Sequence, residues 1–252
     1  MLTSLPRLVV RRVVPLLVPV LLAGCLASTQ QEVQMGQSYA AQLNRQLPLI
    51  TDPEVQRYIT VLGDSLASVA DDRNLDWHFY VVDSPEINAF AVPGGFIYVN
   101  RGLIERSATM SELAGVLGHE IGHVTNRHSM KQMRKGQVAN IGVTAGCIVF
   151  PNACRTPGAD VLINAGGALA FSKFSRDDER QADEVGVKVM VRAGIDPNGI
   201  PAMFRTLDAE RKNRPGALEG FFASHPMPAD RVDDTQQMIR AVDPAIHAAI
   251  PL

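Results

Sequence analysis

Between residues 109 and 125, apolar side chains recur with the spacing of one face of an α-helix. The apolar positions are Leu113, Val116, Leu117, Ile121 and Val124. This i, i+3, i+4 repeat predicts a buried helix, and Thr109-x-x-Glu112 ahead of it fits a capping box, which starts helices. Gly118 and Gly122 lie inside the pattern, although each is about 1 kcal/mol less favourable in a helix than Ala. The two glycines therefore predict a neighbour packed closely against this helix.

The remaining patterns predict a mostly helical α+β protein with a small antiparallel or mixed β-sheet. Alternating apolar residues and glycine-rich turns mark the strands, and 3.6-residue periodicity with start signals marks the helices. The expected elements are helices near 29–46 and 53–70, a strand at 77–82, a hairpin of 90–92 and 96–100 around Pro93-Gly94-Gly95, a helix starting at Ser175-x-x-Asp178, and helical residues towards the C-terminus.

Two further segments, 138–150 and 159–171, are apolar and rich in glycine. Each is too short to span a bilayer comfortably. They are expected either to form a hairpin that reaches lipid or covers the active site, or to be buried helices.

The amino terminus has the pattern of a secretory signal. Three arginines precede an apolar run over 13–22 that is too short to span a membrane. The run ends in Leu22-Ala23-Gly24-Cys25, which resembles a bacterial lipobox. This resemblance implies removal of residues 1–24 and a lipid on Cys25; the alternative is a simple cleaved signal with an incidental cysteine.

A lipid on Cys25 would hold the protein at a membrane without crossing it, since each buried CH₂ contributes about 0.8 kcal/mol. Leu26 follows the cysteine in place of the Asp that marks inner-membrane retention, so the lipobox resemblance implies an outer-membrane lipoprotein that faces the periplasm. The polar residues after it suggest a tether over 25–37, followed by a single domain over 38–252.

Composition excludes one class of partner. The chain is 46% hydrophobic and 20% charged, with a net charge of −2, which gives no electrostatic basis for binding nucleic acid. It contains no internal repeat that would indicate a second domain.

The candidate chemistry lies in the predicted buried helix, where residues 119–123 read H-E-I-G-H. His119 and His123 are four positions apart and share a helix face, so both can bind one Zn²⁺ at about 2.0–2.1 Å. Glu120 beside them suits the role of general base in metal-assisted hydrolysis. The motif alone favours zinc but needs a third ligand.

Two acidic residues of the later helix are candidates for completing the site. Glu179 and Asp183 are four positions apart, so one carboxylate can bind the metal while the other orients a ligand histidine. Such a pair on its own is usually a solvated helix face. The presence of the H-E-x-x-H motif in the same chain, however, favours a metal-binding role for this pair.

Four motifs, taken together, resemble those of the zinc metalloendopeptidase family that includes the HtpX, BepA, LoiP and CAAX prenyl protease types. They are N-A-F-A-V-P-G-G-F-I-Y-V at 88–99, H-E-I-G-H at 119–123, E-x-x-A-D at 179–183 and S-H-P at 224–226. The chain is most similar to the short lipoprotein type. The resemblance implies a gluzincin-type fold with the sheet beside the active-site helix.

The resemblance also implies roles for individual residues. Glu179 corresponds to the third zinc ligand and Asp183 to its partner in the second coordination shell. His225 is expected near the metal, where it either occupies the open coordination position in a resting form or donates a hydrogen bond to the tetrahedral intermediate. Arg231 is expected to help orient the site, and the 88–100 element to hold an extended peptide along a strand edge.

The other histidines and cysteines carry weaker arguments. His78, His128 and His247 have no metal argument, and His128 lies five residues beyond His123, which turns it off the ligand face of a continuous helix. Cys147 and Cys154 are expected either to form a small disulfide loop in an oxidising compartment or to remain two buried thiols.

The sequence and the resemblance therefore predict an envelope zinc metalloendopeptidase. It would hydrolyse internal peptide bonds of misfolded or misassembled envelope proteins, with possible contact to the outer-membrane protein assembly machinery. The alternative from another class is a lipid-anchored chaperone or assembly factor for outer-membrane proteins, with little or no proteolysis. An intramembrane protease is disfavoured because no spanning helices are predicted.

Overall fold

The computed structural model describes residues 27–135, 173–214, 216, 218–226 and 230–242. The signal sequence, Cys25, the two apolar segments, the cysteine pair Cys147 and Cys154, and His247 lie outside the described residues.

A three-stranded mixed sheet, in the order β1-β3-β2, forms the β part of the fold. Strands β1 (His78–Val82) and β3 (Phe96–Asn100) are parallel, while β2 (Ala89–Val92) pairs antiparallel with β3. The expected hairpin is confirmed. Its turn requires Gly94 and Gly95, whose φ angles of 84° and 101° are unfavourable for residues with a side chain.

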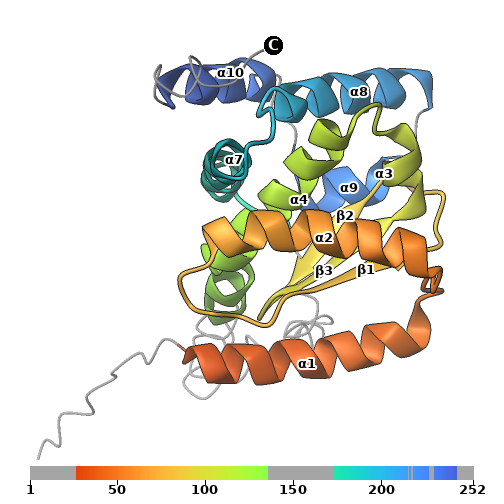
Figure 1. Ribbon diagram of the computed structural model, residues 1–252, viewed down its shortest axis with the longest axis vertical. Helices are drawn as coiled ribbons and strands as arrows, with labels where there is room; N and C mark the ends of the chain where they lie inside the picture. The colour runs from red at the N-terminus through yellow and green to blue at the C-terminus, as the bar shows by residue number, and fades with distance from the viewer. Residues whose placement is uncertain (1–26, 136–172, 215, 217, 227–229, 243–252) are drawn as a thin grey trace, which may run out of the picture.

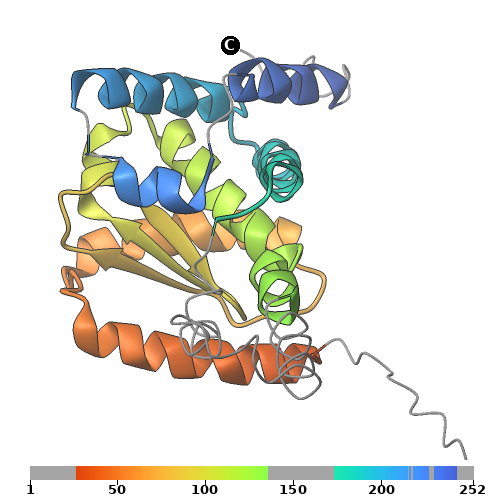
Figure 2. The ribbon, with the colours of Figure 1, turned by 180° about the vertical axis from the view of Figure 1, so that it is seen from behind.

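Helices surround this sheet, which confirms the mostly helical α+β prediction. The described helices are α1 (Thr29–Gln46), α2 (Pro53–Ala70), α3 (Arg101–Arg106), α4 (Met110–Thr125), α7 (Arg176–Arg192), α8 (Gly199–Asn213), α9 (Glu219–Ser224) and α10 (Arg231–Ala241). Figure 1 shows α1 along one end of the molecule, α8 and α10 along the other, and α2 in front of the sheet. The reverse view in Figure 2 shows α9 in front of the sheet.

Helix α4 lies at the centre of the packing and is buried along nearly its whole length, from Glu112 to Val124. It contacts α2, α7, α8 and β2. The close neighbour predicted from the glycines is α7: a Cβ on Gly118 would lie 3.2 Å from the Cα of Gly186, and one on Gly122 would lie 2.9 Å from the Cα of Ala182. Glycine therefore brings the two helices that carry the candidate ligands close together.

The start signals of α4 and α7 differ in detail. Ser175 and Asp178 form both arms of a capping box at α7. At α4, Thr109 accepts a hydrogen bond from the backbone N–H of Glu112, but the Glu112 carboxylate accepts from the N–H of Ala108 and not from that of Thr109. The cap of α4 is therefore only half of the predicted box.

The amino-terminal helix belongs to the packed structure. The sequence predicts a tether over 25–37, but from Thr29 this stretch is helical and Glu32 is fully buried. Its polar residues cap the helix or form ion pairs, as Glu32 does with Arg73. A Cβ on Gly36 would overlap the carbonyl of Pro93, so α1 docks directly on the β2-β3 turn. None of the described helices is long and apolar enough to cross a bilayer.

Candidate metal centre

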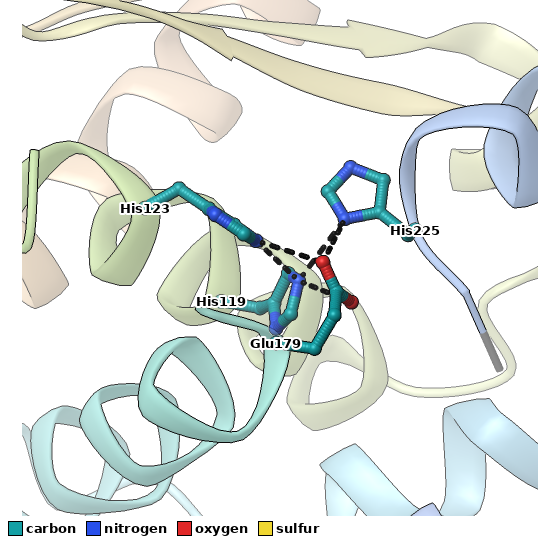
Figure 3. Close-up of side chains that lie close together, drawn as sticks. All are labelled: His119, His123, Glu179 and His225. Carbon is teal, nitrogen blue, oxygen red and sulfur yellow. Dashed lines mark hydrogen bonds and ion pairs between the residues drawn. The ribbon is translucent and has the colours of Figure 1, made fainter. Parts of the chain in front are cut away.

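The two histidines of the H-E-x-x-H motif point from one face of α4 into the interior. His119 is 4% exposed and His123 is 1% exposed, and their Nε2 atoms lie 3.0 Å apart. Figure 3 shows both rings converging on the carboxylate of Glu179, which comes from α7. The helical spacing predicted this geometry.

Glu179 completes a triangle of donor atoms. Its Oε2 lies 3.5 Å from Nε2 of His119, and its Oε1 lies 3.4 Å from Nε2 of His123. In a tetrahedral zinc site with ligand distances of about 2.0–2.1 Å, neighbouring ligand atoms are about 3.3–3.4 Å apart. The separations of 3.0, 3.4 and 3.5 Å are close to this value, with one carboxylate oxygen of Glu179 near each histidine, so the group can surround a zinc ion.

His225 supplies a fourth donor at this point. It directly follows α9, and its Nδ1 lies 3.1 Å from Oε1 of Glu179 and 3.3 Å from Nε2 of His119. Its ring is buried and stacks on Phe221. The donor atoms of all four residues lie within 4.8 Å of one another, a group that can hold one metal ion.

The hydrogen bond between His119 and Asp183 is compatible with a cation at this point. Nδ1 of His119 lies 2.8 Å from the carboxylate oxygen Oδ1 of Asp183, so in the neutral ring Nδ1 carries the proton and Nε2 presents a lone pair. That lone pair faces the carboxylate of Glu179, which also only accepts. Two acceptors that face each other at this distance repel unless a cation lies between them. The residues present therefore fit a bound zinc ion.

Arg231 holds the two carboxylates of α7 in place. Its Nε and Nη2 donate to Asp183 at 3.0 and 2.6 Å, and its Nη1 donates to Glu179 at 2.9 Å. The guanidinium is buried and lies over the ring of Phe204, 4.2 Å from its centroid. The structure thus places Asp183 and Arg231 beside the candidate donor group.

The charges of the site change the protonation of its groups. Burial lowers the pKa of His123 well below its usual value, which leaves the neutral ring that binds metals. Burial by itself would raise the pKa of Asp183, but the charge of Arg231 and the hydrogen bond from His119 lower it below the usual range. Burial would lower the pKa of His225, but the carboxylates of Glu120 and Glu179 raise it.

Glu120 lies beside the donor group without belonging to it. Its side chain is 1% exposed, and neither carboxylate oxygen has a hydrogen-bond partner among the described residues. The imidazole of His225 lies beside it, with Nε2 3.5 Å from Oε1. A carboxylate in such a position is suited to accept a proton from a reactant.

Sequence reasoning missed one residue of the site, His128. A continuous helix would turn it away from His123, but α4 ends at Thr125 and Arg127 adopts a left-handed conformation, with φ of 57°. The chain changes direction at this turn, and as a result Nδ1 of His128 lies 3.0 Å from Nδ1 of His123. A polar residue in the turn, such as Asn126, was the only signal of this helix end. His78, in contrast, lies at the start of β1 and is partly exposed.

Comparison with known proteins agrees with this arrangement. The model of Peptidase family M48 matches residues 51–239. The chain is 34% identical to the beta-barrel assembly-enhancing protease of Escherichia coli K12 over 89% of its own length and 47% of that protein. It thus spans about half the length of that relative.

Two other relatives are more distant. The metalloprotease LoiP of Escherichia coli K12 is 28% identical over 75% of this chain and 72% of LoiP. The mitochondrial metalloendopeptidase OMA1 of Schizosaccharomyces pombe is 28% identical over 72% of this chain and 52% of OMA1. The family match covers the helices that carry every candidate ligand, and the chain belongs to peptidase family M48.

Proposed function

We propose that this metallopeptidase is a zinc-dependent endopeptidase that cleaves internal peptide bonds of proteins. One observation carries the proposal. The donor atoms of His119, His123 and Glu179 converge on one point, and the carboxylate of Glu120, which has no hydrogen-bond partner among the described residues, lies next to them.

Each side chain of the site has a distinct role in this proposal. His119, His123 and Glu179 would hold the Zn²⁺, which supplies a Lewis acid that acidifies water and polarises the scissile carbonyl. Glu120 takes the proton of the attacking water and returns it to the leaving amine. Asp183 and Arg231 hold His119 and Glu179 in position through the contacts described above.

His225 defines a resting form of the enzyme. Its Nδ1 occupies the fourth donor position, and its Nε2 points towards the general base Glu120. A histidine in this place blocks both the coordination position and the base, so we propose that it withdraws before a peptide is cleaved. Once displaced, it remains close enough to donate a hydrogen bond to the tetrahedral intermediate.

The peptide substrate is proposed to bind in extended form. Strand β2 is an edge strand of the sheet, and α4 packs against it. Main-chain hydrogen bonds to a strand edge give affinity without demanding one sequence. This mode suits a protease that acts on exposed segments of misfolded proteins.

The proposed setting is the bacterial envelope. The lipobox-like sequence at Cys25 supports an outer-membrane lipoprotein that faces the periplasm, and the relatives include a beta-barrel assembly-enhancing protease and LoiP, both of Escherichia coli. We propose that the protein removes misfolded or misassembled envelope proteins, beside the outer-membrane assembly machinery. A disulfide between Cys147 and Cys154 stays a prediction.

A second candidate function follows from the name of the relative in Escherichia coli K12. "Assembly-enhancing" describes help to a folding protein, and a chaperone that binds misfolded outer-membrane proteins with little cleavage would also use a strand edge. The buried Glu120 favours cleavage, because its carboxylate makes no hydrogen bond to the described residues and lies beside the metal donors, where a general base is needed.

Cleavage of casein by the purified mature protein tests the proposal. We expect cleavage that a chelator abolishes and added zinc restores. Glu120→Gln should retain zinc and lose activity by about 10²-fold or more, the size of a general-base contribution. Undiminished cleavage by Glu120→Gln would exclude the mechanism. Suppressed aggregation of an unfolded outer-membrane protein, without cleavage by the wild type, would favour the chaperone.

A further inference from the structure

We infer that His128 is a positioning residue for the zinc ligand His123, and that it acts through a hydrogen-bond relay that ends on helix α7. The inference rests on the proposed zinc function. His128 lies outside the H-E-x-x-H motif, and it is not one of the four residues whose donor atoms can hold the metal ion.

The contacts define the path of the relay. Nδ1 of His123, the ring nitrogen that faces away from Glu179, lies 3.0 Å from Nδ1 of His128. Nε2 of His128 lies 3.4 Å from Oε1 of Gln181. The His128 side chain is completely buried, so these protein groups replace the water that would otherwise satisfy its two nitrogens.

Metal binding fixes the direction of every hydrogen bond in this path. A neutral imidazole that offers the Nε2 lone pair to a metal carries its proton on Nδ1. His123 therefore donates from Nδ1, and Nδ1 of His128 accepts. His128 in turn carries its proton on Nε2 and donates it towards Gln181. A proton on Nδ1 of His128 would point at the N–H of His123, and two donors would then face each other. Only the arrangement above therefore gives His123, His128 and Gln181 a matching donor and acceptor.

The far end of the relay is held independently. The amide nitrogen of Gln181 donates to the carboxylate of Asp177 at 2.6 Å, which turns the amide oxygen towards His128. Asp178 offers a second acceptor, 3.7 Å from Nε2 of His128. Gln181 lies on α7, two residues from the ligand Glu179, so one helix supplies both a metal ligand and the anchor of the relay.

The two ligand histidines thus have different supports. His119 donates to the carboxylate of Asp183, which Arg231 holds, whereas His123 donates to a neutral imidazole. Both supports fix the plane of the ring and aim its Nε2 lone pair, and such outer hydrogen bonds strengthen a histidine ligand. Without His128, the ring of His123 would keep its packing against Phe174 but lose the hydrogen bond that selects its tautomer.

The alternative is that His128 only fills space in the core. Two substitutions separate the cases because their side chains have the same number of heavy atoms but differ in polarity. His128→Asn places an amide oxygen where Nδ1 lies and can accept the hydrogen bond from His123. His128→Leu fills a similar volume with an apolar group. A space-filling role predicts that Leu is the better replacement, while the relay predicts that Asn is.

The test measures zinc affinity by competition with a chromophoric chelator, together with the visible absorption of the Co²⁺-substituted protein. We expect His128→Leu to weaken zinc binding about 10–100-fold, as for other second-shell partners of ligand histidines, and to shift the Co²⁺ bands. His128→Asn should restore most of the affinity and the wild-type spectrum. His78→Leu, at a partly exposed position on β1, is the matched control and should change neither.

A second variant covers the case in which His128→Leu does not fold. Gln181→Leu keeps the buried imidazole and removes the nearer of its two acceptors, leaving only Asp178 at 3.7 Å, and it should weaken zinc binding about threefold or more. Wild-type zinc affinity in a folded His128→Leu or in Gln181→Leu overturns the relay. If the wild type itself binds no zinc, the proposed function fails first, so the two failures are distinguishable.

Discussion

The carboxylate oxygen Oδ1 of Asp183 lies 2.8 Å from Nδ1 of His119, on the side of the imidazole that faces away from the other metal donors. The same oxygen accepts from Arg231 at 2.6 Å. Asp183 therefore connects a proposed zinc ligand to a buried cation, and its charge is balanced in the protein interior. Its contribution is to orient His119 and to increase the basicity of the ring nitrogen that binds the metal.

Removal of this carboxylate should weaken zinc binding. We expect Asp183→Ala to raise the zinc dissociation constant about 10–100-fold, since the ring of His119 loses its hydrogen bond and Arg231 loses its main partner. Asp183→Asn retains an oxygen acceptor and should lose less. Chelator competition measures both constants, and equal, wild-type affinity in the two variants would contradict the role of Asp183.

The same carboxylate gives the metal-free protein a specific acid response. Although burial alone would raise it, the pKa of Asp183 is held below its usual range by Arg231 and His119. The folded state thus favours the ionised form more than the unfolded chain does. The ionised group contributes stability above the unfolded pKa of about 3.9, and this contribution disappears as the pH falls towards the folded value.

Urea unfolding of the chelator-treated protein between pH 3 and 7 measures this response. The difference in unfolding free energy between the wild type and Asp183→Asn should be constant above about pH 5 and shrink below about pH 4. Other carboxylates, including Glu179, are present in both proteins and largely cancel. A difference that stays constant down to pH 3 would show that Asp183 is not the group responsible.

The sequence predicted those parts of the site that depend on local spacing. His119 and His123 share a face because four residues make about one helical turn, and the start signal at Ser175 placed Glu179 and Asp183 on a second helix. Which of the two carboxylates binds the metal came from family resemblance. Local spacing could not decide it, because the answer depends on how α7 packs on α4.

The missed features depend on contacts between distant parts of the chain. His128 reaches His123 because α4 ends and Arg127, in a left-handed conformation, redirects the chain before helical residues resume at His128, which periodicity does not reveal. The polar start of α1 suggested a tether because the partners of Glu32 lie far along the sequence, at Arg73 and Arg127. Composition reports that a residue is charged, but not that another element neutralises it.

His225 should restrain the resting enzyme. Its Nδ1 lies 3.3 Å from Nε2 of His119, in the fourth donor position, and its Nε2 points towards Glu120. We expect His225→Ala to retain zinc on the other three ligands and to cleave casein about threefold faster or more, because a larger fraction of molecules is competent to bind substrate. Initial rates at matched zinc content measure this. A tenfold or greater loss of activity would instead assign His225 to transition-state stabilisation.

A cluster of ion pairs ties the amino-terminal helix α1 to the end of α4. The buried carboxylate of Glu32 lies 2.9 Å from Nη1 of Arg73 and 2.7 Å from Nε of Arg127. Arg73 also donates to the carbonyl of Val124 at the end of α4, and Arg127 donates to the carbonyl of Ala27. The three charged side chains thus join the start of α1 to the chain segment that follows His123.

Glu32→Gln should destabilise the fold by about 3–5 kcal/mol, because it leaves two partly buried guanidinium groups without their counter-charge. Glu54→Gln is the matched control: it makes the same chemical change in the exposed first turn of α2 and should alter stability by less than about 0.5 kcal/mol. Urea unfolding of both metal-free variants provides the comparison. Equal stability of the two would mean that water, and not Glu32, solvates the two arginines, and that these ion pairs do not hold α1 in place.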